Sequence, residues 1–221
     1  MDERMLDMFD LFIFDWDGTL TRIHALRRLN QTFNPHWLYM KRGARRAPIH
    51  DGKAPAGALH TRLDEGAGKP FGSGNPALLK LIELSMAFIK PQLQEQTIDT
   101  LKLLREHGKK IALLTDANPY RMLRELSRLG VGAYFDVAVS AQEIGALKPS
   151  PTGIEEILKA TGCTDKGRVV YVGDMADDML AARNAGVRPC AITNGLESAK
   201  ILERFEPWRI FSSMSDFRSA L

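Results

Sequence analysis

Residues 11–20 read LFIFDWDGTL, in which four apolar residues run directly into two acids and a glycine. A short, continuous apolar run is typical of a strand that is buried on both faces of a sheet. Gly18 permits a sharp turn directly after this strand, and Thr19 can form hydrogen bonds within the turn. Because Asp15 and Asp17 are two residues apart at the strand end, both carboxylates can project into one site as the chain leaves the sheet.

Similar apolar runs recur along the chain and alternate with helical patterns. The predicted strands are residues 11–14, 111–115, 137–139, 169–172, 189–193 and 208–211. The predicted helices are residues 92–107, 118–129, 151–161 and 176–185, and a glycine follows each of them. Strands that are separated by single helices form right-handed βαβ crossovers and a parallel sheet. The sequence therefore predicts an α/β fold with a Rossmann-like, doubly wound parallel sheet as its core.

The segment from residue 21 to residue 90 breaks this alternation. Its apolar residues fall at helical spacing, its glycines cluster between residues 66 and 74, and a further helix is predicted to open at Asn75-Pro76. We therefore expect two domains. Residues 1–20 and 91–221 form the α/β core domain, and residues 21–90 form a helical cap domain that is inserted after the first strand.

The composition is that of a globular protein, with 44% hydrophobic and 26% charged residues in a chain of 221. No segment is long and apolar enough to span a membrane, and the first apolar run is too short for a signal peptide. We therefore expect a cytoplasmic protein with no membrane partner. Cys163 and Cys190 lie far apart and lack the spacing of metal ligands, which predicts two reduced thiols rather than a disulfide or a zinc site.

Three further segments carry polar residues at predicted strand ends or helix starts. Thr115 and Asp116 follow the second strand, Lys148 precedes a predicted helix, and GDMADD at 173–178 follows the fourth strand. Each segment has an ordinary alternative: a strand-end threonine, a solvated lysine, or acids at a helix N-terminus. A calcium loop at residues 15–20 is disfavoured because no further ligands follow at the required spacing. Their joint occurrence favours one functional site at the carboxyl edge of the sheet.

The four segments, in this order, resemble the motifs of the haloacid dehalogenase superfamily of phosphatases. The resemblance covers residues 8–20 and 91–195, and the insertion resembles the layout of the phosphoglycolate phosphatase and β-phosphoglucomutase branch. It implies a Mg²⁺-dependent phosphatase that hydrolyses a small phosphorylated metabolite through an aspartyl-phosphate intermediate. By this resemblance Asp15 is the nucleophile, and Asp17 protonates the leaving oxygen and then takes a proton from water.

The resemblance also implies roles for the remaining residues. Thr115, Asp116 and Lys148 bind the substrate, and Thr115 and Lys148 also take part in catalysis, where Lys148 neutralises the charge that develops on the phosphoryl group. The implied metal ligands are Asp15, Asp17, Asp174 and Asp178. Among these, Asp17 contributes its backbone carbonyl.

Elementary electrostatics also favours a cation at this position. Several carboxylates that meet at one edge of a sheet repel one another unless a positive charge lies between them. A ligand set made only of oxygen atoms favours Mg²⁺ over zinc. Two details stay open: the direction of Asp116, which stands where the family more often carries Asn, and the choice between Asp177 and Asp178 as the second acid.

Positive charge is concentrated in the predicted cap. Seven Lys or Arg and no Asp or Glu lie between Thr21 and His50, although the net charge of the whole chain is only +3. This asymmetry indicates an anionic partner for the segment. Arg22 lies just after the expected hinge and is a candidate for binding a second anionic group of the substrate, with a solvated helix face as the alternative. Nucleic acid also stays open as a partner, although aromatic residues at helical spacing are more typical of a cap core.

Other functions remain open at this point. A phosphomutase of the same fold would return the phosphoryl group to a sugar, and a nucleic-acid-end phosphatase or binding protein would use the basic cap. A binding protein without catalysis is disfavoured because it has no need of both Asp15 and Asp17. The sequence is compatible with a monomer or a homodimer.

Overall fold

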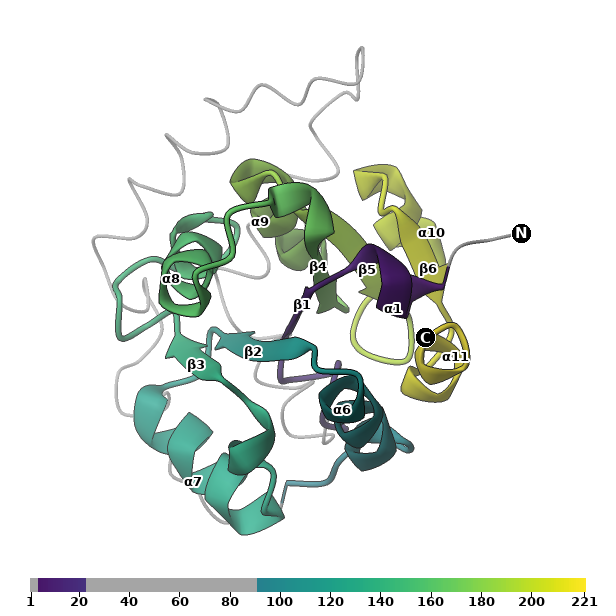
Figure 1. Ribbon diagram of the computed structural model, residues 1–221. Coiled ribbons are helices and arrows are strands. Elements are labelled where there is room, and N and C mark those ends of the chain that lie inside the picture. The colour runs from purple at the N-terminus through teal and green to yellow at the C-terminus, as the bar shows by residue number, and fades with distance from the viewer. Residues whose placement is uncertain (1–3, 23–90) are drawn as a thin grey trace. The chain divides into compact units, whose positions relative to one another are not determined.

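The computed structural model describes residues 4–22 and 91–221, and both stretches contribute to one six-stranded parallel sheet (Figure 1). In chain order the strands are β1 (Leu11–Phe14), β2 (Lys110–Thr115), β3 (Val137–Ser140), β4 (Val169–Gly173), β5 (Arg188–Ile192) and β6 (Arg209–Phe211). Their order across the sheet is β3-β2-β1-β4-β5-β6, and every neighbouring pair is parallel. The first strand of the chain therefore lies in the middle of the sheet, between β2 and β4.

Helices cover both faces of this sheet. Among the described residues they are α1 (Met5–Met8), α6 (Thr97–Glu106), α7 (Pro119–Leu129), α8 (Thr152–Thr161), α9 (Ala176–Ala185), α10 (Ala199–Leu202) and α11 (Met214–Ser219). Alternate side chains of β1 enter two separate cores. Phe12 and Phe14 pack with residues of α6, α7 and α11, whereas Leu11 and Ile13 pack with residues of α8 and α9. The predicted doubly wound α/β fold is confirmed.

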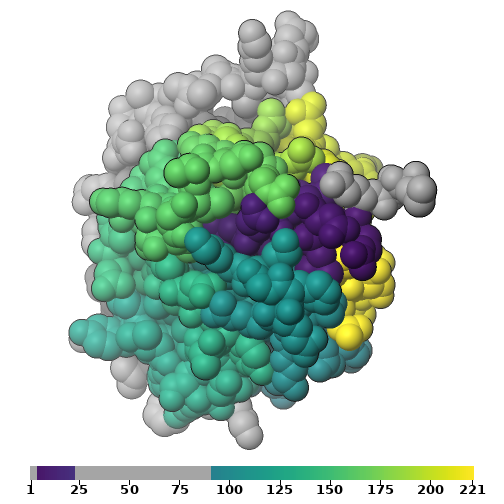
Figure 2. All heavy atoms as spheres, viewed as in Figure 1, coloured from purple at the N-terminus to yellow at the C-terminus, as the bar shows by residue number. Residues whose placement is uncertain are grey.

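The N-terminal segment is enclosed by parts of the chain that are distant in sequence. In the space-filling view it lies between the segment that follows residue 91 and the C-terminal residues (Figure 2). All four side chains of β1 are fully buried. Burial of each such side chain contributes roughly 1.5–3 kcal/mol, and burial on both faces explains why the strand is a continuous apolar run.

The start of α7 agrees with its sequence signals. Asn118 Oδ1 accepts a hydrogen bond of 2.9 Å from Tyr120 N, and Pro119 occupies the first helical position. Gly130 ends the helix in the left-handed conformation, with φ of 66°. Because β2 ends only a few residues earlier, at Thr115, this capping fixes where α7 begins relative to the end of β2.

The helix predicted at residues 92–107 begins later than expected, at Thr97. The residues before it pair instead with the stretch that follows β1. This pairing comprises hydrogen bonds from Arg22 N to Gln92 O (2.8 Å) and from Gln94 N to Leu20 O (2.9 Å), and an antiparallel bridge between Thr21 and Leu93. Backbone groups that are used in this pairing are not available to a helix. We call the two paired stretches, residues 20–22 and 92–94, the neck.

The predicted cap, residues 21–90, lies outside the described residues apart from Thr21 and Arg22, and it stays a prediction together with its basic segment. The described residues belong to one compact unit, Met1–Ile23 with Pro91–Leu221. In this part of the chain, no helix has both the length and the apolar character needed to cross a membrane. Cys163 and Cys190 carry free thiols, as the sequence predicts.

Candidate active site

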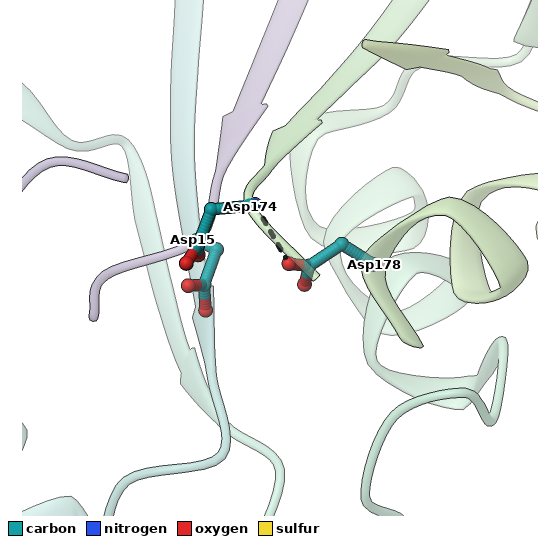
Figure 3. A group of neighbouring side chains, drawn as sticks. All are labelled: Asp15, Asp174 and Asp178. Atoms are coloured by element: carbon teal, nitrogen blue, oxygen red, sulfur yellow. Dashed lines mark hydrogen bonds between the residues drawn. The ribbon is translucent and has the colours of Figure 1, made fainter. Parts of the chain in front are cut away.

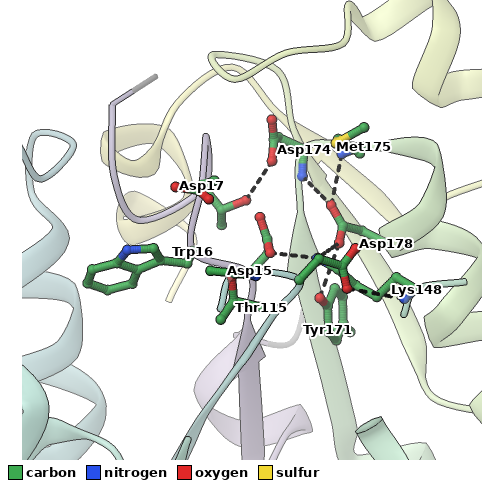
Figure 4. A network of polar contacts seen from close by, with 12 residues as sticks. Asp15, Trp16, Asp17, Thr115, Lys148, Tyr171, Asp174, Met175 and Asp178 are labelled. Atoms are coloured by element: carbon green, nitrogen blue, oxygen red, sulfur yellow. Dashed lines mark hydrogen bonds and ion pairs between the residues drawn. The ribbon is translucent and has the colours of Figure 1, made fainter. Parts of the chain in front are cut away.

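The carboxyl ends of three adjacent strands bring together the polar residues of the predicted site. Asp15 directly follows β1, and its amide N donates a hydrogen bond of 2.9 Å to Val172 O of β4. Thr115 ends β2, and Asp174 directly follows β4. Because these strands are parallel and adjacent, their carboxyl ends meet at one edge of the sheet. Figure 4 shows the resulting group of side chains beyond the strand ends.

Three buried carboxylates lie at the centre of this group (Figure 3). One oxygen from each of Asp15, Asp174 and Asp178 lies within 4.8 Å of the others. Asp15 is 5% exposed, and Asp174 and Asp178 are fully buried. We call these three residues the acid cluster. The structure therefore brings together the three predicted metal ligands that would bind through their side chains.

Backbone and hydroxyl donors hold two members of the acid cluster in place. Asp178 Oδ2 accepts hydrogen bonds from Asp174 N at 3.0 Å and from Met175 N at 2.9 Å. Asp174 accepts hydrogen bonds from Thr19 Oγ1 at 3.1 Å and from Leu196 N at 2.7 Å. Fixed outer partners of this kind orient carboxylates toward a ligand before the ligand binds.

Lys148 lies between two of these carboxylates. Its Nζ is 2.6 Å from Asp15 Oδ1 and 2.7 Å from Asp178 Oδ1, and the residue is only 6% exposed. Tyr171 of β4 donates a hydrogen bond of 3.1 Å to the same oxygen of Asp178. Tyr171 was not predicted as a site residue, and its one signal in the sequence is a hydroxyl group within an otherwise apolar strand. The structure thus places Lys148 beside Asp15, and the catalytic roles implied for both residues stay predictions.

Acidic groups outnumber basic groups at the centre of the site. Burial raises the pKa of Asp15 to about 7, against the opposing effect of Lys148 and with a further contribution from Asp178. Burial, and then the charges of Asp15 and Asp178, raise the pKa of Asp174 well above its usual value. Burial alone would lower the pKa of Lys148, but Asp15 and Asp178 outweigh it and raise that pKa well above its usual value. When all three acids are ionised, one lysine leaves an excess of negative charge, and the all-oxygen donor set fits a hard divalent cation such as Mg²⁺.

Asp17 lies apart from the acid cluster. Its side chain is 20% exposed and forms an ion pair with Arg121 of α7, which is 18% exposed. Trp16 stands between Asp15 and Asp17 in the sequence, and its side chain points away from Asp174 (Figure 4). Its indole N donates a hydrogen bond of 2.7 Å to Glu125 Oε2. Neither Arg121 nor Glu125 was predicted from the sequence as a residue near the site. The metal contact predicted for Asp17, through its backbone carbonyl, stays a prediction.

Thr115 and Asp116 lie at the end of β2. Thr115 is 1% exposed, and its Oγ1 accepts a hydrogen bond of 3.1 Å from Ala117 N. Asp116 Oδ1 accepts a hydrogen bond of 3.2 Å from Lys148 N. Its backbone O accepts another, of 2.9 Å, from Gln142 Nε2. The direction that the sequence left open is therefore toward the backbone of Lys148, where Asp116 joins two loops of the site.

Two other candidates of the sequence lie outside the acid cluster. Asp177 is buried, but among the described residues the acid that completes the cluster is Asp178. Burial, and then the charge of Asp116, raise the pKa of Asp177 well above its usual value. Arg22 forms an ion pair of 3.0 Å with Glu95, and its side chain is 50% exposed. The substrate contact predicted for Arg22 stays a prediction.

Comparison with known proteins places the chain in a family. The model of the haloacid dehalogenase-like hydrolases matches residues 9–186. A pyrophosphatase PpaX from Halalkalibacterium halodurans is 30% identical over 122 residues, which are 55% of this chain and 56% of that protein. Phosphoglycolate phosphatase 1 from Pseudomonas aeruginosa is 29% identical over 119 residues, 54% of this chain and 43% of that protein. The chain thus spans about half the length of the curated relatives that it matches.

Solved structures share the fold at lower identity. A HAD family hydrolase from Deinococcus radiodurans, with bound phosphate and sodium, has a TM-score of 0.67 at 20% identity and covers 96% of this chain and 94% of its own. A HAD-superfamily hydrolase from Ehrlichia chaffeensis has a TM-score of 0.57 at 18% identity, with coverage of 96% and 95%. At these identities the likeness shows the fold alone. The family match extends over most of the sequence, and the chain therefore belongs to the haloacid dehalogenase-like hydrolases.

Proposed function

We propose that this protein is a Mg²⁺-dependent phosphatase that hydrolyses a small phosphomonoester through an aspartyl-phosphate intermediate on Asp15. The observation that carries the proposal is the buried contact between Asp15 and Lys148, within an acid cluster of otherwise uncompensated charge. A phosphoryl group that reaches Asp15 would meet the Lys148 ammonium group in the same low-dielectric site. Fixed positive charge in such a site stabilises the negative charge that develops during transfer.

The acid cluster is the part of the site that would hold Mg²⁺. Asp15, Asp174 and Asp178 offer carboxylate oxygens close together, and the resemblance adds the backbone carbonyl of Asp17. When bound, the ion would neutralise the negative charges of the carboxylates and of the phosphate, and it would polarise the phosphoryl group. The remaining chemistry belongs to the protein's own residues.

The reaction has two halves, and both use Asp15 and Asp17. Asp15 attacks phosphorus with a carboxylate oxygen while the bond from phosphorus to the leaving oxygen breaks, and the carboxyl group of Asp17 donates a proton to that oxygen. Lys148 and Thr115 bind the phosphoryl oxygens during the transfer. In the second half, ionised Asp17 takes a proton from the water that attacks phosphorus. The bond between phosphorus and Asp15 then breaks, and inorganic phosphate leaves with Asp15 restored.

The substrate that we propose is a small phosphorylated metabolite. Curated relatives are named as a pyrophosphatase, a phosphoglycolate phosphatase and a glyceraldehyde 3-phosphate phosphatase, and all three names refer to small phosphorylated compounds. The related structure from Deinococcus radiodurans holds phosphate. The alternative of a nucleic-acid substrate depends on the basic segment outside the described residues, and the same experiment tests it.

The test is phosphate release from a panel that contains phosphoglycolate, pyrophosphate, sugar phosphates, nucleotides and an oligonucleotide with a terminal phosphate. We expect Mg²⁺-dependent release with one small compound far ahead, loss of release in EDTA, and loss of release in Asp15→Asn. An active, folded Asp15→Asn protein would contradict the mechanism. Phosphoryl transfer between positions of a sugar, without free phosphate, would identify a phosphomutase instead. A folded protein that releases phosphate only from the oligonucleotide would contradict the proposed substrate class.

A further inference from the structure

Helix α7 contacts the chain between the two catalytic acids at two points. Glu125 Oε2 accepts a hydrogen bond of 2.7 Å from the indole N of Trp16, and Arg121 forms an ion pair with Asp17. Arg121 and Glu125 are four residues apart, so they lie one turn apart on the same face of the helix. This face of α7 therefore meets the loop that connects the nucleophile to the proposed general acid.

Packing alone does not explain why a carboxylate, rather than an apolar side chain, stands at the buried position 125. Glu125 is 1% exposed and Trp16 is fully buried, whereas the other buried residues of α7 are the apolar Met122 and Leu126. A carboxylate at such a position is costly unless it is hydrogen-bonded. Indole offers a single hydrogen-bond donor, and Glu125 accepts from it. The carboxylate thus fixes the orientation of the Trp16 ring, which an apolar residue of similar size would not do.

The orientation of Trp16 bears directly on Asp17. Asp15 is held by burial and by Lys148, whereas the side chain of Asp17 is 20% exposed and forms its ion pair with Arg121 on the same helix face as Glu125. Trp16 precedes Asp17 in the chain, so a fixed ring at residue 16 restricts the backbone from which Asp17 projects. A catalytic group that is misplaced by about 1 Å can lose on the order of 100-fold in rate.

We propose that Glu125 is a positioning residue: through Trp16, it holds the loop so that Asp17 lies where it can protonate the leaving oxygen. This inference rests on the proposed function of the site. It predicts a defect in one chemical event, proton donation to the leaving group, rather than a general loss of activity.

Leaving-group dependence separates that defect from a loss of structure. The alkoxide of β-glycerol phosphate needs a proton as it leaves, whereas p-nitrophenolate leaves readily without one. Because kcat/KM reports the steps up to departure of the leaving group, it is not affected by the later hydrolysis of the aspartyl-phosphate. In Glu125→Ala and in Trp16→Phe we expect kcat/KM to fall about 10- to 100-fold for β-glycerol phosphate, but less than about threefold for p-nitrophenyl phosphate.

Matched variants sharpen the test. Glu125→Gln keeps an oxygen that can accept from the indole, and it should restore most of the kcat/KM that Glu125→Ala loses with β-glycerol phosphate. The double variant Glu125→Ala with Trp16→Phe should lose no more than either single variant, because both remove the same hydrogen bond. Arg128→Ala, an exposed change in the last turn of α7, controls for substitution of this helix. If Glu125→Ala fails to fold, Trp16→Phe removes the hydrogen bond from its other end.

The outcomes are distinct. A fall that is equal for the two substrates, or no fall in either variant, overturns the role of Glu125 while the proposed phosphatase stands. A Glu125→Gln protein as impaired as Glu125→Ala also overturns it, because the hydrogen bond would then not be the cause. A folded wild-type protein that releases phosphate from neither compound contradicts the proposed function, and the role of Glu125 with it.

Discussion

Lys148 Nζ lies 2.6 Å from Asp15 Oδ1, in a contact where neither side chain is more than 7% exposed. The two residues are 133 positions apart in the sequence, and the contact joins the loop before α8 to the end of β1. Little water reaches such a pair, so its electrostatic interaction is only weakly screened by salt. The charge balance of the acid cluster therefore depends on this contact and on any cation that binds beside it.

Replacement of Lys148 by Ala should reduce kcat by about 10²–10³-fold, because the variant lacks the fixed positive charge that stabilises the transferring phosphoryl group. Steady-state phosphate release in saturating Mg²⁺ measures this effect. Lys159→Ala, an exposed change on α8, is the matched control and should leave kcat unchanged. Wild-type turnover by a folded Lys148→Ala protein would show that the contact has no catalytic role.

The stability of the metal-free protein should fall as pH rises from about 4 to about 7. Burial raises the pKa of folded Asp15 from 3.8 to about 7, so in this window the folded state binds more protons than the unfolded state. The ionised group then costs the folded state on the order of 4 kcal/mol at most. Denaturation in EDTA at several pH values checks this, and the dependence should be weaker in Asp15→Asn. Asp99→Asn, an exposed change in the first turn of α6, should keep the wild-type dependence.

Substitution of Asp178 should abolish the stabilisation of the folded protein by Mg²⁺, whereas substitution of the adjacent Asp177 should not. A ligand at about 100 times its Kd stabilises the folded state by roughly 2.7 kcal/mol. We expect this gain in the wild type and in Asp177→Asn, and its loss in Asp178→Asn, because Asp178 belongs to the acid cluster. Thermal unfolding of each protein in Mg²⁺ and in EDTA measures this stabilisation. The reverse pattern would assign the second acid to Asp177.

Gly195→Ala should weaken Mg²⁺ binding without contributing or removing any charged group. A Cβ at Gly195 would lie 2.1 Å from Asp174 Oδ2, so the carboxylate would have to move. We expect a loss of affinity of at least about tenfold, by analogy with the effect of displacing residues that orient a metal ligand. Gly132→Ala is the control, because its Cβ would meet Leu126 at an ordinary 3.8 Å. Isothermal titration of the metal-free proteins with Mg²⁺ compares the two, and equal affinities would contradict the prediction.

Much of the fold was predictable because its central strands leave few alternatives. The apolar runs at residues 11–14 and 169–172 are buried on both faces of the sheet, and both were predicted as strands. The predicted start of α6, at residue 92, was wrong by several residues, because the helix begins at Thr97. Residues 92–94 were included in the predicted helix, but their backbone groups pair with the stretch after β1, and no local pattern indicates this pairing. A tertiary contact thus overrode a local preference.

The members of the acid cluster were expected from strand-end positions and from the family resemblance, but the residues around the cluster were not. Asp15 and Asp174 follow strands whose carboxyl ends meet at one edge of the sheet, whereas the choice of Asp178 over Asp177 stayed open in the sequence. The contacts of α7 join residues that are more than 100 positions apart, from Trp16 to Glu125 and from Arg121 to Asp17. A helical pattern in the sequence does not indicate which distant group a polar side chain of α7 will meet.

The neck has a consequence for how such a protein can diversify. Because Thr21 and Leu93 already lie side by side, the core itself holds the two ends of whatever chain connects them. Each doubling of a flexible connection costs only about 0.6 kcal/mol of closure entropy. Selection can therefore change the length and composition of the intervening residues almost independently of the sheet. The buried acids and Lys148 can be inherited unchanged while the inserted segment is remodelled.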